Sequence, residues 1–396
     1  MTKKLWESTA GQLHPTIESY TVGDDYQLDQ QLISYDVAAS IAHVQMLKKI
    51  KLLTAAETRQ LTTGLKKIAN LNQRKKFVIK LSDEDGHTAI ENYLIKTLGL
   101  VGKKVHTGRS RNDQILVALR LYMKDHINQI DNQVLSLAKK INQTAKKYQQ
   151  TAMPGYTHTQ KAMETTVGTW LDSFASALAD DQLLIAAAKK IIDQNPLGSV
   201  SGFGEKSLKL DRKTTTKLLG FAKTQNNPMY CAYSRGKFEL IVLDTLSQVM
   251  LDLGKLANDL VWFTAKEFSY FDLPTKFKTG SSAMPQKQNF DVLELVRANV
   301  SVFLGYRAQT EGIIQKLLSG YNRDFQLTKK PLLESVTLIE KTIAVMELVI
   351  SNLIINKKYL AAAGTDELKA TEEAYRLVKK GLPFRDAYTQ IAKKYR

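Results

Sequence analysis

Residues 114–153 read QILVALRLYMKDHINQIDNQVLSLAKKINQTAKKYQQTAM, a stretch without glycine or proline. Its apolar side chains recur every three or four residues, the spacing that places them on one face of an α-helix. They are Met123, Ile127, Ile130, Val134, Leu137 and Ile141. A stripe this long, with a nearly heptad step, predicts a long helix that packs against other helices along one side.

Four further segments repeat the pattern, at residues 167–185, 238–260, 292–303 and 332–350. Together with the first they predict a mainly α protein built on a bundle of five long helices. Several of these helices are apolar around more than one face. This favours burial against further copies of the chain and therefore an oligomer, although a monomeric bundle with a thick core remains open.

The segments that flank the bundle divide the chain into three expected domains. Residues 1–108 form a mixed helical domain, 109–358 the long-helix bundle, and 359–396 a short helical end. In the first domain a helix is expected over residues 36–51, and Thr54 with Glu57 forms a capping-box start for the next. Residues 77–79 (Phe-Val-Ile) are expected as a short strand.

Composition narrows the class of protein. A chain of 396 residues with 43% apolar residues has enough material for a large core. Its single cysteine, Cys231, rules out an internal disulfide framework. The opening residues lack the pattern of a secretory leader, and no apolar run is long enough to cross a bilayer, so a cytoplasmic protein without membrane contact is expected.

The net charge of +17 invites a nucleic-acid hypothesis. The basic residues are dispersed as Lys-Lys pairs on expected helices, however, and no groove-reading motif accompanies them. We therefore expect no nucleic-acid partner. Scattered histidines and the absence of ligand spacings or phosphate-binding glycine loops predict neither a metal site nor a nucleotide cofactor.

Chemistry concentrates in GSSAMPQKQNFDVLELVRA, residues 280–298. Ser281 supplies a hydroxyl, the following residues supply free backbone N–H groups, and Lys287 supplies a cation. Such a loop has the groups needed to remove a proton from a carbon beside a carboxylate and to hold the resulting negative charge. The short GSS sequence alone carries little weight, because a surface Gly-Ser loop before a helix that begins near Asp291 would also explain it.

Two other stretches place polar groups before a long helix. HTGRSRNDQ, residues 106–114, concentrates hydroxyl, guanidinium and amide groups at a helix entrance, an arrangement suited to a carboxylate. MPGYTHTQ, residues 153–160, carries His158, which can act as an acid or a base near neutral pH. Taken singly, each is better explained by an ordinary helix start with capping contacts.

Together these stretches resemble the fumarase/aspartase superfamily of lyases, and HTGRSRNDQ is similar to the argininosuccinate lyases in particular. EDGHTAIE (84–91), SGYNRDFQLTK (319–329) and Asp29 with the residues near it match the same family pattern. The resemblance runs from about residue 5 to 390. It implies a three-domain fold with a central long-helix bundle, a homotetramer with active sites shared between subunits, and no cofactor.

The implied activity is that of a carbon–nitrogen lyase: β-elimination of argininosuccinate to L-arginine and fumarate, the last step of arginine biosynthesis. By resemblance, Ser281 is the base, Lys287 stabilises the developing charge, and His158 paired with Glu294 assists the leaving group. The substrate-binding residues implied by the same match are Asp29, His87, Ser110, Arg111, Asn112, Thr157, Asn289, Tyr321, Gln326 and Lys329.

The sequence departs from the family pattern in four places: residues 6–10 (Trp-Glu-Ser-Thr-Ala) lack an arginine that the family has there, the C-terminal domain is shorter than usual, and residues 25 and 287–291 differ. Gln288 replaces a lysine, Phe290 replaces a proline, and Asp25 stands where the family has a serine, which places an anion near an anionic substrate. These departures leave open a catalytically weakened or repurposed, non-enzymatic relative. Adenylosuccinate lyase, fumarase and aspartase share the GSS loop but lack HTGRSRNDQ, so they rank behind.

Overall fold

The computed structural model describes residues 13–395, and its elements are almost all helical. By proximity of Cα atoms the chain forms two compact units. Unit 1 comprises the described part of Met1–Gln129 with Ile185–Thr245 and Gly305–Thr337. Unit 2 comprises Ile130–Leu184, Leu246–Leu304 and Leu338 to the end of the described chain.

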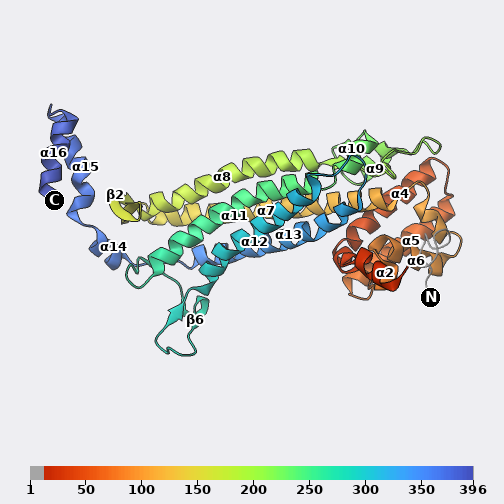
Figure 1. The fold of residues 1–396 in the computed structure, drawn as a ribbon, viewed down its shortest axis with the longest axis horizontal. Helices are drawn as coiled ribbons and strands as arrows, with labels where there is room; N and C mark the ends of the chain where they lie inside the picture. Colours follow the sequence, from red (N-terminus) through yellow and green to blue (C-terminus); the bar gives the residue numbers. More distant parts are fainter. Residues whose placement is uncertain (1–12, 396) are drawn as a thin grey trace. The chain divides into compact units, whose positions relative to one another are not determined.

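Five long helices contribute residues to both units (Figure 1). They are α7 (Arg111–Lys147), α8 (Val167–Ile192), α11 (Lys237–Thr264), α12 (Asp291–Ile314) and α13 (Lys329–Ser351). All five expected long helices are therefore confirmed. The apolar stripe that predicted α7 is buried, since none of its six side chains from Met123 to Ile141 is more than 2% exposed.

Unit 1 holds the shorter helices before α7 and between α8 and α11. They are α2 (Pro15–Val22), α3 (Asp25–Leu28), α4 (Ile33–Lys49), α5 (Ala55–Gln73), α6 (Gly86–Leu98), α9 (Arg212–Leu218) and α10 (Pro228–Tyr233). A two-stranded parallel sheet pairs β3 (Gln194–Asn195) with β4 (Lys223–Thr224). The core of α4, α5 and α6 includes Leu47, Leu61, Leu65 and Leu94, all buried.

Sequence signals explain the start of α5 but not the segment after it. Thr54 Oγ1 accepts from the Glu57 N–H at 3.2 Å and the Thr54 N–H donates to Glu57 Oε2 at 2.8 Å, so the capping box is confirmed. The expected strand at residues 77–79 is wrong. Instead of a neighbouring strand, the Gln30 side chain accepts from the Ile79 N–H at 3.1 Å and donates to the Phe77 carbonyl at 2.8 Å.

In unit 2 the long helices are joined by side-chain contacts. Hydrogen bonds connect α7 with α8 (Gln182–Asp131), α8 with α11 (Trp170–Asp259) and α11 with α12 (Arg297–Asn258). Close packing requires glycine on α11, because a Cβ at Gly254 would lie 2.5 Å from Val300 on α12. These contacts form the central bundle that the apolar stripes predicted.

The remaining elements of unit 2 are short. Three antiparallel pairs join β1 (Ala152–Thr157) to β2 (Gln160–Thr166), β5 (Phe271–Asp272) to β8 (Ile354–Ile355) and β6 (Thr279–Gly280) to β7 (Gln288–Asn289). Three helices follow: α14 (Lys357–Ala363), α15 (Ala370–Lys379) and α16 (Phe384–Tyr395).

Helix α7 ends at Lys147, before the end of the glycine-free stretch. The reason is a close crossing at the start of α8. The Gly168 N–H donates to the Tyr148 carbonyl at 3.1 Å, and a Cβ at residue 168 would lie 2.5 Å from the Gln149 Cα. The chain after α7 then enters the β1–β2 hairpin before α8 begins.

Candidate active site

A pocket in unit 1 brings together side chains from five stretches that are far apart in the sequence. Of the predicted substrate-binding residues, it is lined by Asp29, His87, Arg111, Asn112, Tyr321, Gln326 and Lys329. Asp25, Glu84, Asp85, Arg235 and Arg323 complete the charged part of its wall. Acidic and basic groups thus line one cleft together, which suits a ligand with both signs of charge.

Lys329 is the charged centre of this pocket. Its ammonium donates to Asp25 Oδ1 at 2.9 Å and to Asp29 Oδ1 at 2.5 Å, and its side chain is 2% exposed. Burial lowers the pKa of Lys329, but the two carboxylates outweigh it and leave that pKa raised. The second Asp29 oxygen accepts from the Gly86 N–H at 2.9 Å, at the start of α6.

The pKa values of the two carboxylates, Asp25 and Asp29, shift in opposite directions. Burial raises the pKa of both, and at Asp29 Lys329, His87 and the Gly86 N–H together outweigh burial, so that the pKa is lowered. At Asp25 burial prevails and the pKa is raised despite the same lysine. The environment of the pocket therefore favours the ionised form of Asp29 and disfavours that of Asp25.

His87 forms a second buried ion pair next to the first. Its Nδ1 contacts Asp36 Oδ2, and Asp36 also accepts from Ser40 Oγ at 3.1 Å. Although burial alone lowers the pKa of His87, the Asp36 carboxylate raises it above the usual range. Arg109 supports this pair by donating to Ser40 Oγ at 2.8 Å. The Nε2 of His87 is buried and has no hydrogen-bond partner among the described residues.

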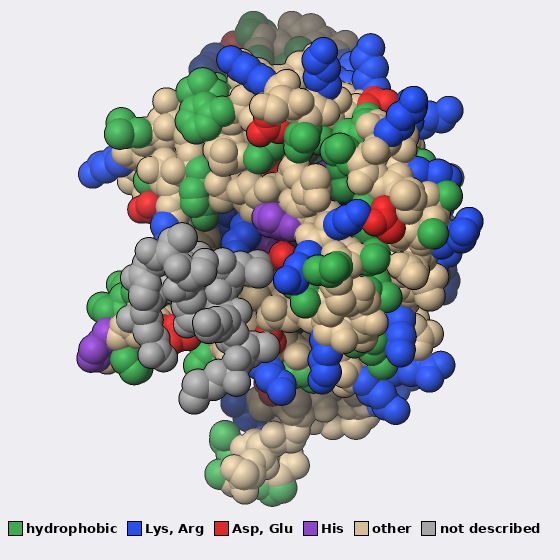
Figure 2. Space-filling model, turned by 90° about the vertical axis from the view of Figure 1, so that its right-hand side faces the viewer, with side chains coloured by type: hydrophobic (Ala, Val, Ile, Leu, Met, Phe, Trp, Pro, Cys, Tyr) green, Lys and Arg blue, Asp and Glu red, His purple; other side chains and the backbone are tan. Residues whose placement is uncertain are grey.

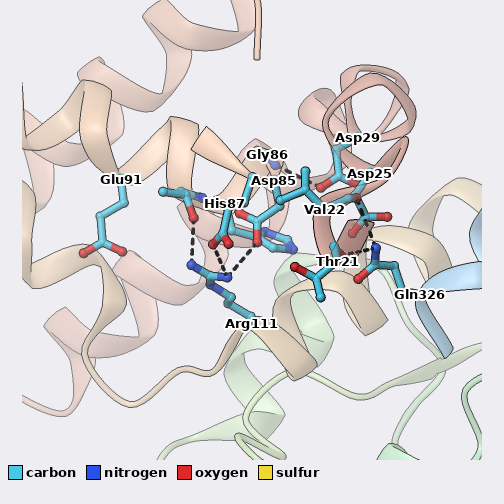
Figure 3. A network of polar contacts seen from close by, with 12 residues as sticks. Thr21, Val22, Asp25, Asp29, Asp85, Gly86, His87, Glu91, Arg111 and Gln326 are labelled. Atoms are coloured by element: carbon cyan, nitrogen blue, oxygen red, sulfur yellow. Dashed lines mark hydrogen bonds and ion pairs between the residues drawn. The ribbon is translucent and has the colours of Figure 1, made fainter. Parts of the chain in front are cut away.

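Arg111 lies at the first position of α7 and faces the start of α6 (Figure 3). Its guanidinium donates to Glu84 at 3.0 Å and to Thr88 Oγ1 at 3.2 Å, and Asp85 lies at 3.4 Å. Asp85 itself caps α6 by accepting from the Thr88 N–H at 2.8 Å. The predicted helix entrance therefore has an arginine already bound to acidic groups.

The turn before α7 is held by a residue that the sequence did not single out for this role. Asp113 accepts from the Ser110 N–H at 2.9 Å and, through its other oxygen, from the N–H groups of Gly198 and Val200 at 2.9 and 3.2 Å. The Asn112 N–H donates to Ser110 Oγ at 3.3 Å. These bonds fix Ser110 and Asn112 in one tight turn.

Gln326 and Arg323 connect the pocket to the C-terminal end of α2. The Gln326 amide donates to the carbonyls of Thr21 and Val22 at 3.0 and 3.2 Å, and Arg323 donates to the Thr21 carbonyl at 2.8 Å. Figure 3 shows Gln326 beside Val22 and Asp25. Neither Arg323 nor the buried Arg235 was predicted as a site residue, because each is a single arginine in its stretch.

Unit 2 carries the other predicted residues. Residues 280–289, the signature loop, are closed by the β6–β7 pair, in which Thr279 faces Asn289 and Gly280 faces Gln288. Between these strands, Ser281 Oγ accepts from the N–H groups of Ala283 and Met284 at 3.3 and 3.0 Å. Lys287 is exposed and Asn289 half-buried. Glu294 is exposed in the first turn of α12.

His158 lies at the tip of the β1–β2 hairpin in unit 2. The two residues of the turn, His158 and Thr159, have φ of 52° and 62°, values that a tight hairpin turn requires and that side chains other than glycine seldom adopt. Thr157 and His158 are both exposed. A strained, exposed histidine is the kind of position that functional sites retain.

Within residues 13–395, no three His, Cys, Asp or Glu side chains group so that they could hold a metal ion. No helix in the same range is long and apolar enough to cross a bilayer. Lys and Arg side chains are scattered over the face in Figure 2 among acidic and apolar ones.

Comparison with known proteins identifies what the chain resembles. A family model described as lyase matches residues 18–305. The argininosuccinate lyase of Thermotoga neapolitana is 42% identical over 395 residues, covering 100% of this chain and 99% of that protein.

Two solved structures share the fold. EDDS lyase in complex with formate has a TM-score of 0.82 at 24% identity, with 96% of this chain and 76% of that one covered. Class II fumarase from Schistosoma mansoni has a TM-score of 0.76 at 14% identity, with 95% and 91% covered. The expected fumarase/aspartase-like fold is confirmed.

Proposed function

We propose that this chain, which belongs to the argininosuccinate lyase family, catalyses the β-elimination of argininosuccinate to L-arginine and fumarate. It would act as a carbon–nitrogen lyase in the last step of arginine biosynthesis, without a metal or cofactor. The observation that carries the proposal is the pocket of unit 1, where Asp29, His87, Arg111, Asn112 and the segment 321–329 converge. Their mixed charges suit a substrate that contains a zwitterionic amino acid.

Ser281 is the proposed base, which removes the proton from the carbon next to a substrate carboxylate. A serine hydroxyl is a weak base, so its environment must stabilise the alkoxide. The N–H groups of Ala283 and Met284 point at its oxygen and support this role. Lys287, in the same loop, would stabilise the charge that develops on the substrate carboxylate.

The other residues bind the two halves of the substrate. Ser110, Asn112, Thr157 and Asn289 would hold the part that leaves as fumarate. Tyr321, Gln326 and Lys329 would hold the arginine part, with Asp29 and His87 fixing Lys329 and the pocket wall. His158, with Glu294 of another subunit, would assist the departing guanidinium group.

A homotetramer with shared active sites is part of the proposal. Exposed apolar side chains on the long helices support it, among them Leu183, Leu184, Leu251, Leu295, Val302 and Leu348. We also propose the three domains 1–108, 109–358 and 359–396 as functional divisions, and a cytoplasmic location.

The test is fumarate release by the purified protein with argininosuccinate, beside adenylosuccinate, aspartate and malate. We expect turnover on argininosuccinate alone, and a loss of at least about 100-fold in kcat in Ser281→Ala, because proton-transfer groups supply that much. Ser301→Ala, the same change on an exposed face of α12, is the control. Turnover of another substrate would reassign the chain within the superfamily.

A folded oligomer that turns over none of the four substrates would instead indicate a repurposed relative. Gln288, Phe290 and Asp25 would then be the first residues to change back to the family pattern. A Ser281→Ala variant that kept more than about a hundredth of the wild-type kcat would exclude serine as the base.

A further inference from the structure

We infer that Asp25 is a specificity-determining residue, which binds the α-ammonium group of the amino-acid part of the substrate. The inference rests on the proposed function and adds a residue to it. Asp25 lies at the start of α3, on the wall of the unit 1 pocket, with its side chain 17% exposed.

The charge balance around Lys329 favours a cationic ligand group. Lys329 already has two carboxylate partners, Asp25 and Asp29, so the ion-paired group carries one net negative charge, which the nearby Arg235 guanidinium offsets until it meets a ligand carboxylate. Asp25 uses Oδ1 for Lys329, and its Oδ2 has no hydrogen-bond partner within residues 13–395. Because burial outweighs Lys329 and leaves the pKa of Asp25 raised, another cation beside it would offset the cost of burying this carboxylate.

A second acceptor lies next to Asp25. The last carbonyls of α2 belong to Thr21 and Val22, at the helix end where the partial charge is negative. The Thr21 carbonyl already accepts from Gln326 and Arg323, whereas the Val22 carbonyl accepts from Gln326 at 3.2 Å and has a lone pair to spare. An ammonium group, with three donors, fits between Asp25 and Val22.

The opposite charge of an amino-acid ligand also finds a partner in this pocket. Arg235 is 4% exposed, and its Nε has no hydrogen-bond partner among the described residues. Tyr321 and Arg323 line the same pocket. An α-carboxylate bound to Arg235 and an α-ammonium beside Asp25 would satisfy both poles of a zwitterion.

The experiment measures the binding of three ligands by calorimetry, which separates the contribution of the α-ammonium group from that of the α-carboxylate. They are L-arginine, agmatine (which lacks the α-carboxylate) and deaminoarginine (which lacks the α-ammonium). We expect Asp25→Asn to weaken L-arginine and agmatine about 10- to 100-fold, the range for a lost charge-assisted hydrogen bond. Deaminoarginine should bind within about threefold of wild type, which also proves that the variant pocket is folded.

Asp24→Asn is the matched control. Asp24 is the preceding residue and pairs with Lys330 at 3.0 Å, but both side chains are more than half exposed. This variant should bind all three ligands as wild type does. Asp25→Ser, which introduces the family residue, should repeat the Asp25→Asn result, and both should raise KM for argininosuccinate more than they lower kcat.

Two results would overturn the inference. Tighter binding of L-arginine and deaminoarginine by Asp25→Asn would mean that Asp25 competes with the ligand carboxylate for Lys329. An equal loss for L-arginine and deaminoarginine would mean that Asp25 acts through structure alone. Failure of the proposed function is seen separately, as absence of fumarate release by the wild-type protein.

Discussion

At the scale of single residues, the pocket is built on buried ion pairs rather than on isolated charges. His87 with Asp36 and Lys329 with Asp25 and Asp29 are each removed from water, which is costly unless the partners stay together. Removing one partner leaves the other charge buried and alone. The stability of the fold should therefore depend on pH through these pairs.

Asp36→Asn tests this dependence. The folded pKa of His87 lies above its unfolded value of about 6.5, so its contribution is full below that pH and is lost as the pH rises through the folded pKa. The folded pKa of Asp36 is lowered, so its contribution is present above about pH 4 and lost at lower pH. The substitution should cost about 3–5 kcal/mol of unfolding free energy near pH 5.5 and less at pH 9.

Urea unfolding at both pH values, at one protein concentration, measures this difference. Asp386→Asn, at an exposed position of α16, removes the same charge and should cost less than about 0.5 kcal/mol at either pH. An Asp36→Asn cost that is equal at pH 5.5 and pH 9 would contradict the ion-pair account.

At the scale of elements, Lys278 contacts both residues of the β7 region that we expect to differ from the family pattern. Its ammonium contacts Asp272 at 2.6 Å and Gln288 at 3.3 Å, and it lies 5.2 Å from the centre of the Phe290 ring. The glutamine and the phenylalanine that replace a lysine and a proline thus both contact one cation at the base of the β6–β7 hairpin. We expect these cation–π and hydrogen-bond contacts to stiffen the base of the hairpin.

We therefore expect Lys278→Met to lower kcat on argininosuccinate by about tenfold, because small displacements of a catalytic loop are costly. Lys276→Met, on the same segment, removes a cation that lies over the Phe277 ring and should leave kcat within about twofold. Steady-state kinetics of the two variants provides the comparison. Equal kcat values for wild type and Lys278→Met would show that the hairpin does not depend on this lysine.

At the scale of the whole molecule, apolar side chains remain exposed where a monomer would bury them. Leu295 is 62% exposed and Val302 47%, and their spacing of seven residues places them on one face of α12. Similar residues lie on α8, α11 and α13. A surface of this kind is what a helical bundle that packs against its own copies would present.

Light scattering at micromolar concentration should accordingly give a mass near four times the 44.5 kDa of one chain. Leu295→Lys places a charge on the exposed apolar face and should shift the mass toward smaller species, with loss of activity. Lys341→Ala, at an exposed position of α13, is expected to leave the mass unchanged. A monomer mass for the wild-type protein would refute the oligomer and the shared active sites.

The sequence alone determined the parts of this protein that depend on local order. Ile130, Val134 and Leu137 lie close together in the sequence, so their spacing alone predicts one face of a helix. Thr54 and Glu57 are three residues apart, so the capping box was also predictable from the sequence. The signature loop was recognisable because its groups are contiguous.

The tertiary structure decided the rest, because the decisive contacts join residues that are distant in the chain. Lys329 meets Asp29 across 300 residues, and Gln30 replaces the expected strand partner of residues 77–79. No local sequence pattern indicates which carboxylate pairs with a buried lysine, since that pairing depends on burial and on which charges the fold brings together. The sequence thus determined the helices and the chemistry of the loop, while packing determined how the charges of the pocket are paired.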